Sequence, residues 1–140
     1  MHLFVYGSLM FEPVWSRLVQ GTYGHREARL YGFARRKVRH DVYPVVFPAE
    51  RCDGVDGLVY LNVSAADIAR LDHFEGEFYE RQMHPVRIEN GPDVAAAVYV
   101  LKDQYDHLID SSEWDPQWFA TEGLPTFLGQ YNGFQAESTS

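Results

Sequence analysis

The sequence contains one cysteine, Cys52, among its 140 residues. A lone cysteine cannot form a disulfide within the chain, so we expect a reducing compartment. Cys52 lies in the tetrapeptide Arg51-Cys52-Asp53-Gly54, where no helix N-terminus is evident that would activate the thiol. A turn residue is therefore the simpler interpretation of Cys52, and a catalytic nucleophile is the alternative.

Basic residues are scarce as well: 12 Lys and Arg stand against 20 Asp and Glu, which gives a net charge of −8. This charge argues against a nucleic-acid partner and against adsorption to anionic membranes. No apolar stretch approaches the length of a transmembrane helix, and no basic region followed by a long apolar run opens the sequence. We therefore expect a soluble, cytoplasmic protein that handles small molecules.

Two kinds of catalytic motif are also missing from the sequence. The six histidines are scattered, and none is spaced as H-x-H or H-E-x-x-H, so we expect no metal site. Ser8 lies outside any nucleophile-elbow context and has no obvious His and Asp set around it. Metal-dependent and serine-nucleophile mechanisms are therefore not indicated.

Apolar and aromatic residues, in contrast, are plentiful. The hydrophobic fraction is 46% and the aromatic fraction 15%, enough for the core of one domain of this length. We expect that single domain to span residues 1–134, because Gln135–Ser140 is a polar tail with nothing to bury. Tyrosines, which combine a flat ring with a polar end, suit both a core and a pocket wall.

Sequence patterns predict a β-rich chain with three helices. Strands are predicted at Leu3–Val5, Ala28–Phe33, Ala34–His40, Val55–Asn62, Tyr79–Ile88 and Val94–Leu101, with an extended, proline-bounded pocket wall at Asp41–Pro48. Helices are predicted at Glu12–Gln20 and Val63–Gly76, and a short one from Trp114 that runs toward Leu128 unless Gly123 and Pro125 interrupt it. Asp103–Asp110 is predicted to be a polar connector, and the basic run Arg35–Arg39 a solvated strand edge.

The first candidate site is the tetrapeptide Tyr6-Gly7-Ser8-Leu9, which follows the opening strand. A strand that ends in glycine and then offers successive backbone N–H groups can hold a carboxylate or an oxyanion. Gly7 would let the backbone approach a ligand closely, because it has no Cβ. The alternative is an ordinary strand-to-turn junction, since glycine is common in turns.

The helix Val63–Gly76 carries the second candidate. Ser64 is a good N-cap with Asp67 three residues later, a variant of the capping box, and Gly76 supplies the stop. Ile68 and Leu71 mark the buried face, and the same spacing puts Glu75 on or near it.

A carboxylate at that position would have unusual acid–base properties. Burial raises the pKa of a carboxylate, and the negative end of the helix dipole acts in the same direction. Glu75 could then exchange a proton near neutral pH. Two alternatives remain open at this point: the helix ends before Glu75 and the side chain is solvated, or Glu75 pairs with Arg70 or Arg81.

Together the two candidates resemble a known family. Tyr6–Leu9 and Leu71-Asp72-His73-Phe74-Glu75-Gly76-Glu77-Phe78-Tyr79-Glu80-Arg81 are similar to the two signature motifs of the γ-glutamylcyclotransferase-like superfamily, in its AIG2-like and γ-glutamylamine cyclotransferase branch. Val42–Val45 and Glu113–Trp118 resemble further segments of AIG2-like members. The resemblance extends from Leu3 to about Leu128.

This resemblance implies an α+β fold: a small mixed β-barrel of about six or seven strands, flanked by a few short helices, with the ligand pocket at one end. It also implies an enzyme that needs no cofactor. The α-amine of a γ-glutamyl group attacks its own γ-carbonyl, 5-oxoproline forms, and the amine or amino acid on that carbonyl leaves. Such a ring closure is intramolecular, so most of the task is to fold the substrate into attacking geometry.

The resemblance also implies roles for individual residues. Glu75 matches the catalytic glutamate, which takes a proton from the α-ammonium and returns one to the leaving amine. Tyr6, Gly7, Ser8 and Leu9 match the loop that binds the substrate. Tyr79 is expected to line the pocket and Arg81 to form a structural ion pair. Glu77 is a competing candidate for the base, because it would point the same way as Glu75 if this segment were extended; Tyr105 is a further candidate by position.

A second hypothesis is a binding module that keeps the fold and the pocket without catalysis, since a fold hosts more than one function. The expected partner in both cases is a small γ-glutamyl compound, with neither a nucleic acid nor a membrane. The identity of the leaving group and the oligomeric state stay open at this stage.

Overall fold

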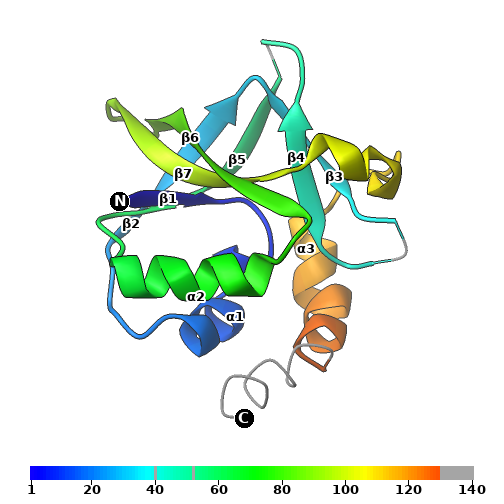
Figure 1. Ribbon diagram of the computed structural model, residues 1–140, viewed down its shortest axis with the longest axis horizontal. Helices are drawn as coiled ribbons and strands as arrows, with labels where there is room; N and C mark the ends of the chain where they lie inside the picture. Colours follow the sequence, from blue (N-terminus) through cyan, green and yellow to red (C-terminus); the bar gives the residue numbers. More distant parts are fainter. Residues whose placement is uncertain (40, 52, 130–140) are drawn as a thin grey trace.

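A computed structural model describes residues 1–39, 41–51 and 53–129. Its core is a closed five-stranded barrel in the order β1-β5-β2-β6-β7, beside a separate two-stranded sheet of β3 and β4 (Figure 1). The strands are β1 (His2–Val5), β2 (His25–Tyr31), β3 (Phe33–Lys37), β4 (Pro44–Pro48), β5 (Gly54–Tyr60), β6 (Tyr79–Ile88) and β7 (Asp93–Leu101). The α-helices are α1 (Glu12–Leu18), α2 (Ala65–Glu75) and α3 (Pro116–Trp118), and further helical turns of 3₁₀ or π type are η1 (Ser8–Met10), η2 (Asp103–Leu108) and η3 (Phe119–Gly123). The predicted α+β barrel is confirmed, with five of the seven strands in the barrel itself.

Strand β1 lies between β5 and β7 and closes the barrel. It runs antiparallel to β5, with Leu3 opposite Tyr60, and parallel to β7, with Leu3 opposite Ala97. Its residues Leu3, Phe4 and Val5 are 0 to 2% exposed, as expected of a strand flanked on both sides and covered on both faces. The end of β1 therefore delivers residues 6–9 to a fixed point at one end of the barrel.

The basic segment around β3 is not a solvated edge throughout. Arg35 is half-buried between the two sheets. Its Nη1 donates to the carbonyl oxygens of Tyr6 at 2.8 Å and Asp56 at 3.2 Å, and its guanidinium lies 5.0 Å from the centre of the Trp114 ring. Carbonyl acceptors and a stacked ring offset part of the cost of burying the charge. The strand predicted to reach His40 ends at Lys37.

Helix α2 begins and ends as predicted, but Asp67 does not complete a capping box. The Ser64 side chain accepts the Asp67 N–H at 3.2 Å. The Asp67 carboxylate, however, accepts the N–H groups of Gln20 at 3.0 Å and Gly21 at 2.9 Å. The hydroxyl of Tyr23 takes the capping role instead and accepts the Ser64 N–H at 3.1 Å. These bonds also explain why α1 ends at Leu18 and not at Gln20: the following amides are held by Asp67.

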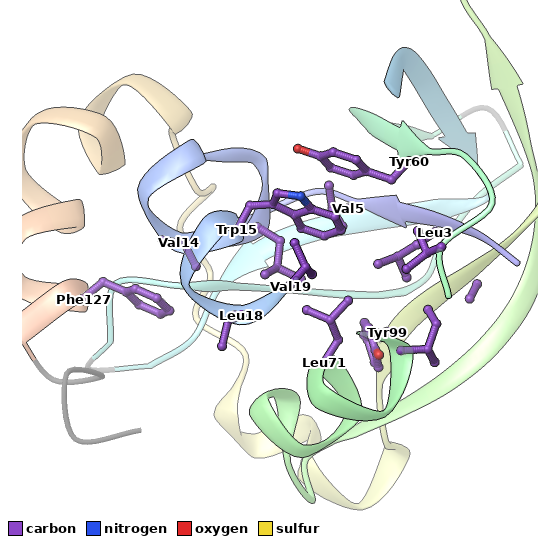
Figure 2. Close-up of a cluster of buried hydrophobic side chains, with 14 of the residues drawn as sticks. Leu3, Val5, Val14, Trp15, Leu18, Val19, Tyr60, Leu71, Tyr99 and Phe127 are labelled. Atoms are coloured by element: carbon purple, nitrogen blue, oxygen red, sulfur yellow. The ribbon is translucent and has the colours of Figure 1, made fainter. Parts of the chain in front are cut away.

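Helices α1 and α2 cover one side of the barrel, where they enclose the larger part of the core (Figure 1). Figure 2 shows the indole of Trp15, from α1, beside the ring of Tyr60, from β5; the rings stack with centres 3.8 Å apart and planes 9° from parallel. Leu71, from α2, is fully buried in the same cluster. The buried face predicted for α2 is therefore confirmed.

The C-terminal helix is longer than predicted. It continues through η3 and on over residues 124–129, so neither Gly123 nor Pro125 interrupts it. Within η3 the Leu124 N–H bonds to Phe119 O, five residues back. This wider turn lies directly before Pro125 and absorbs the irregularity that a proline imposes on a regular helix. Phe127, buried in the core, anchors the end of the segment.

Two other segments differ from expectation. The predicted connector Asp103–Asp110 contains the 3₁₀ helix η2, closed by bonds such as Tyr105 N–H to Lys102 O at 3.0 Å, because short polar connectors readily satisfy their backbone in such turns. Strand β2 starts at His25, three residues earlier than predicted, because His25 still pairs with Tyr60. Cys52 and the predicted tail Gln135–Ser140 lie outside the described residues. Among those described, no helix is long and apolar enough to cross a bilayer.

Candidate active site

One cavity of about 660 Å³ opens where the end of β1, the end of α2 and the starts of β4 and β6 meet. It collects residues that are far apart in the sequence. The six site residues proposed from the sequence all line it: Tyr6, Gly7, Ser8, Leu9, Glu75 and Tyr79. The lining also includes Tyr43, Pro44, Phe74, Gly76, Glu77, Phe78, Tyr99 and Phe127.

Gly7 is required by a neighbour within the protein. A Cβ at Gly7 would lie 2.7 Å from Cγ and 2.9 Å from Cδ of Pro44, closer than such atoms approach in proteins. The sequence explained this glycine by close approach of a ligand; the structure shows that the ring of Pro44 occupies the space. The proline at the start of β4 and the loop after β1 thus form one wall.

The turn after Gly7 exposes backbone donors to this wall. In η1 the first hydrogen bond runs from Met10 N–H to Gly7 O at 3.0 Å. Ser8 and Leu9 precede it, so their N–H groups have no partner within the turn. Both residues line the cavity, which makes their amides candidates for holding an anionic group.

Arg35 fixes the peptide between Tyr6 and Gly7 from outside the cavity. It donates to Tyr6 O at 2.8 Å, and the carbonyl and the following N–H of a trans peptide point in opposite directions. The Gly7 N–H therefore points to the side opposite Arg35. The Tyr6 hydroxyl is also engaged: it donates to Tyr99 O at 2.6 Å, and burial, followed by the nearby Glu75 charge, raises the Tyr6 pKa well above its ordinary value.

Glu75 is the last residue of α2 and is half-buried at the cavity wall. Burial first, and the neighbouring Asp72 second, raise the pKa of Glu75 to about 8. Gly76 ends the helix with a φ of 77°, a conformation that a glycine adopts without strain. The negative end of the helix is therefore next to the carboxylate and also disfavours its charge.

Glu75 fits neither of the two alternatives that the sequence left open, an early end of the helix or an ion pair with Arg70 or Arg81. The helix includes Glu75, so the side chain is not released into solvent by an earlier end. Arg70 pairs with Asp67, Nη1 to Oδ1 at 2.7 Å, and Arg81 pairs with Asp72, Nε to Oδ1 at 3.5 Å. Neither arginine therefore neutralises Glu75. The structural ion pair expected of Arg81 is present.

Asp72 and Tyr99 were not identified from the sequence. The Tyr99 hydroxyl donates to Asp72 Oδ1 at 2.7 Å, and burial together with this bond raises the Tyr99 pKa. Both residues border a smaller hollow of about 280 Å³ that shares Glu75 and Tyr79 with the main cavity. Asp72 lies within the motif Leu71–Arg81, so the sequence alone could have identified it as a site residue. Tyr99 is placed beside Asp72 by the register of β7, which the sequence does not predict.

The remaining candidates have distinct positions. The Tyr79 hydroxyl donates to Pro44 O at 3.2 Å, so its ring is fixed along the wall. Glu77 lines the cavity but is exposed, and it follows the helix end, so it does not share the environment of Glu75. Tyr105 packs edge-on against Phe78 with ring centres 4.7 Å apart; it is one layer behind the lining.

The family model for gamma-glutamyl cyclotransferase, AIG2-like, matches residues 3–116. The chain belongs to this family. The matched range contains the loop after β1, the whole of α2 and the start of β6.

Known proteins of the family resemble the chain in sequence and in fold. AIG2-like protein D of Arabidopsis thaliana is 33% identical over 121 residues, which covers 81% of this chain and 79% of that protein. A solution structure of an Arabidopsis thaliana protein is 26% identical with a TM-score of 0.70 and covers 99% of this chain and 84% of that one. A gamma-glutamyl cyclotransferase structure, at 20% identity and a TM-score of 0.62, covers 73% of this chain and 66% of that one and shares the fold.

Proposed function

We propose that this AIG2-like protein is a γ-glutamyl cyclotransferase, which releases 5-oxoproline and a free amine from a γ-glutamyl compound. The observation that carries the proposal is the position of Glu75: a half-buried carboxylate with a pKa of about 8, in the same cavity as the loop residues Ser8 and Leu9. A carboxylate with this pKa can both accept and return a proton near neutral pH. Membership of the family supports the same reaction class.

The reaction would proceed as an intramolecular acyl transfer. The Glu75 carboxylate takes a proton from the substrate's α-ammonium group, and the freed amine attacks the γ-carbonyl carbon. The N–C bond of the five-membered ring forms, and the carbonyl oxygen becomes an oxyanion. Protonated Glu75 then gives its proton to the leaving nitrogen, the C–N bond to that nitrogen breaks, and the carbonyl is restored. The regenerated Glu75 carboxylate takes the second proton from the ring nitrogen and passes it to the released amine, which leaves as an ammonium ion. Atoms and charges balance without water or a cofactor.

The cavity would contribute by positioning and by electrostatics. The amides of Gly7, Ser8 and Leu9 would hold the α-carboxylate or the developing oxyanion, and donors fixed in advance are the most effective form of such stabilisation. Holding the amine in attacking geometry beside the γ-carbonyl lowers the entropic part of the activation barrier, because the free substrate reaches that geometry only in some of its conformations.

A product assay with three variants tests the proposal. Purified protein is offered γ-glutamyl amines and γ-glutamyl amino acids, and 5-oxoproline is quantified. We expect Glu75→Gln to lower kcat about 10²–10⁴-fold, the usual contribution of a general acid–base group. Glu80→Gln, which removes an exposed carboxylate of β6 outside the cavity lining, is the matched control and should leave kcat unchanged. Glu77→Gln tests the neighbouring carboxylate, and a larger loss there than in Glu75→Gln would reassign the base.

Other outcomes would change the functional class. Free glutamate in place of 5-oxoproline would indicate a hydrolase, with water instead of the α-amine as the nucleophile. If no compound is turned over while γ-glutamyl ligands still raise the melting temperature, the protein is a binding module of this fold. If γ-glutamyl compounds are not turned over and also cause no thermal shift, the prediction of a γ-glutamyl ligand is contradicted.

A further inference from the structure

The cavity is larger than the group that is proposed to react in it. A γ-glutamyl group of about ten non-hydrogen atoms fills roughly 300 Å³ or less, counted at the ~30 Å³ that a water molecule occupies. The cavity measures about 660 Å³. More than half of it is therefore available to the leaving group, and the chemistry of that remaining space should select the substrate.

Aromatic rings form most of this space. Five rings line the cavity besides Tyr6 and Tyr99: Tyr43, Phe74, Phe78, Tyr79 and Phe127. Three of them pack edge to face on one another, with ring centres 6.3 Å apart for Tyr43 and Phe127 and 6.0 Å apart for Phe74 and Phe127. Rings held in place in this way offer flat apolar faces and edges to a ligand.

Positive charge is missing from the lining. Every Lys and Arg of the sequence lies within the described residues, and none of these lines the 660 Å³ cavity. Arg35 reaches Tyr6 from outside it, and Arg81, paired with Asp72, borders only the smaller hollow. The ionisable carboxyl groups in the lining are those of Glu75 and Glu77. A second carboxylate on the substrate would therefore meet like charge.

Three tyrosine hydroxyls of the lining are already engaged within the protein and are not available to such a carboxylate. Tyr6 donates to Tyr99 O, Tyr99 to Asp72, and Tyr79 to Pro44 O. The backbone amides of residues 7–9 serve the α-carboxylate or the oxyanion of the γ-glutamyl group in the proposed reaction. A carboxylate on the leaving group would exchange its hydration for a lining with no basic side chain, which is costly.

We propose that the leaving group is an amine that bears an aromatic ring and no carboxylate, so that the substrates are γ-glutamyl arylalkylamides in preference to γ-glutamyl amino acids or peptides. This inference rests on the proposed cyclotransferase function. The ring would pack among the aromatic side chains, and the missing carboxylate avoids Glu77. Selection would thus combine an attractive and a repulsive element.

Three substrates separate these two elements. γ-Glutamyl-phenethylamide and γ-glutamylphenylalanine differ only by the carboxylate, and γ-glutamyl-ethylamide lacks only the ring. We expect kcat/KM for the phenethylamide to exceed each of the others by about tenfold or more. Equal or faster turnover of γ-glutamylphenylalanine, or of the ethylamide, would overturn the inference.

A charge-reversal variant tests the repulsive element directly. Glu77→Arg puts a cation at the cavity and should reduce the preference for the phenethylamide over γ-glutamylphenylalanine at least severalfold. Glu80→Arg makes the same change of net charge three residues further on, outside the lining, and should leave the preference as it is. A preference that Glu77→Arg does not change would contradict the electrostatic explanation.

Binding measurements keep the inference independent of turnover. The same three compounds are titrated into Glu75→Gln by calorimetry, where chemistry is blocked and only affinity is compared. If all release 5-oxoproline from the wild-type protein equally well, the proposed function stands and this inference fails. If none releases it, the proposed function fails, and the order of affinities still decides whether the cavity prefers an aromatic, carboxylate-free group.

Discussion

Helix α2 carries a buried carboxylate near its start, Asp67, and a half-buried one at its end, Glu75. Asp67 is 1% exposed, yet it accepts from four donors: Gln20 N–H, Gly21 N–H, the Tyr23 hydroxyl at 2.6 Å and Arg70 Nη1 at 2.7 Å. Burial acts to raise the Asp67 pKa, but these donors outweigh it, so the pKa lies below its ordinary value.

Glu75 has the opposite outcome on the same helix. It has no ion pair among the described residues, its close charged neighbour is Asp72, and its pKa is about 8. The helix dipole adds to the contrast, because it favours negative charge at the start of α2 and disfavours it at the end. The lesson is that burial alone does not decide whether a carboxylate is structural or reactive; the donors brought to it do.

The largest effect on this comparison is expected from Asp67→Ala. The substitution leaves two backbone N–H groups, a hydroxyl and a guanidinium without their shared acceptor, and removing one member of such a buried set costs about 3–5 kcal/mol. Urea unfolding at pH 7 should show that loss in the free energy of unfolding. Asp67→Asn, which keeps one acceptor oxygen, should lose less; an equal loss in both variants would mean that charge, and not the acceptor, is what matters.

Glu75 should affect stability with the opposite pH dependence. Its pKa is about 8 in the folded protein against an ordinary 4.5, so between these values the unfolded state has lost the proton that the folded state keeps. The stabilising contribution of protonated Glu75 to the free energy of unfolding is therefore full below about pH 4.5 and is lost as pH rises through about 8. Its size is up to about 5 kcal/mol at 1.36 kcal/mol per pKa unit.

Glu75→Gln removes this titration and provides the measurement. As pH is raised from 4.5 to 8.5, the unfolding free energy of the wild type should fall relative to that of the variant. A difference that stays constant over this range would show that Glu75 titrates like an exposed glutamate and would remove the basis for its proton-transfer role.

The smallest of the three effects is expected from Tyr23→Phe. The hydroxyl donates to Asp67 and accepts the Ser64 N–H, and loss of such bonds costs about 1–2 kcal/mol. Because one donor that lowers the Asp67 pKa is removed, this pKa should rise. The stability that depends on ionised Asp67 is lost as pH falls through the folded pKa, so the midpoint of acid unfolding should move to higher pH. An unchanged midpoint would exclude Tyr23 as a determinant of the Asp67 charge.

Local sequence patterns were sufficient for α2 and for most strands. Ser64 and Gly76 mark the ends of the helix, and Ile68 and Leu71 its buried face, because caps and periodicity depend on residues within a few positions of each other. The same patterns gave Asp67 the wrong role. Its partners Gln20, Gly21 and Tyr23 come from a loop more than forty residues earlier, and such contacts leave no local trace.

The sequence by itself put Glu75 at the predicted end of a helix, on or near its buried face, and Gly7 after the first strand, and it left open whether the helix reaches Glu75. Only the tertiary structure decided what surrounds them: Pro44 against Gly7, Arg35 behind Tyr6, and the absence of basic side chains from the cavity lining among the described residues. The physical reason is that backbone periodicity is fixed over short stretches of chain. The pKa of a carboxylate and the charge of a cavity, in contrast, are set by groups that meet only when distant strands pair.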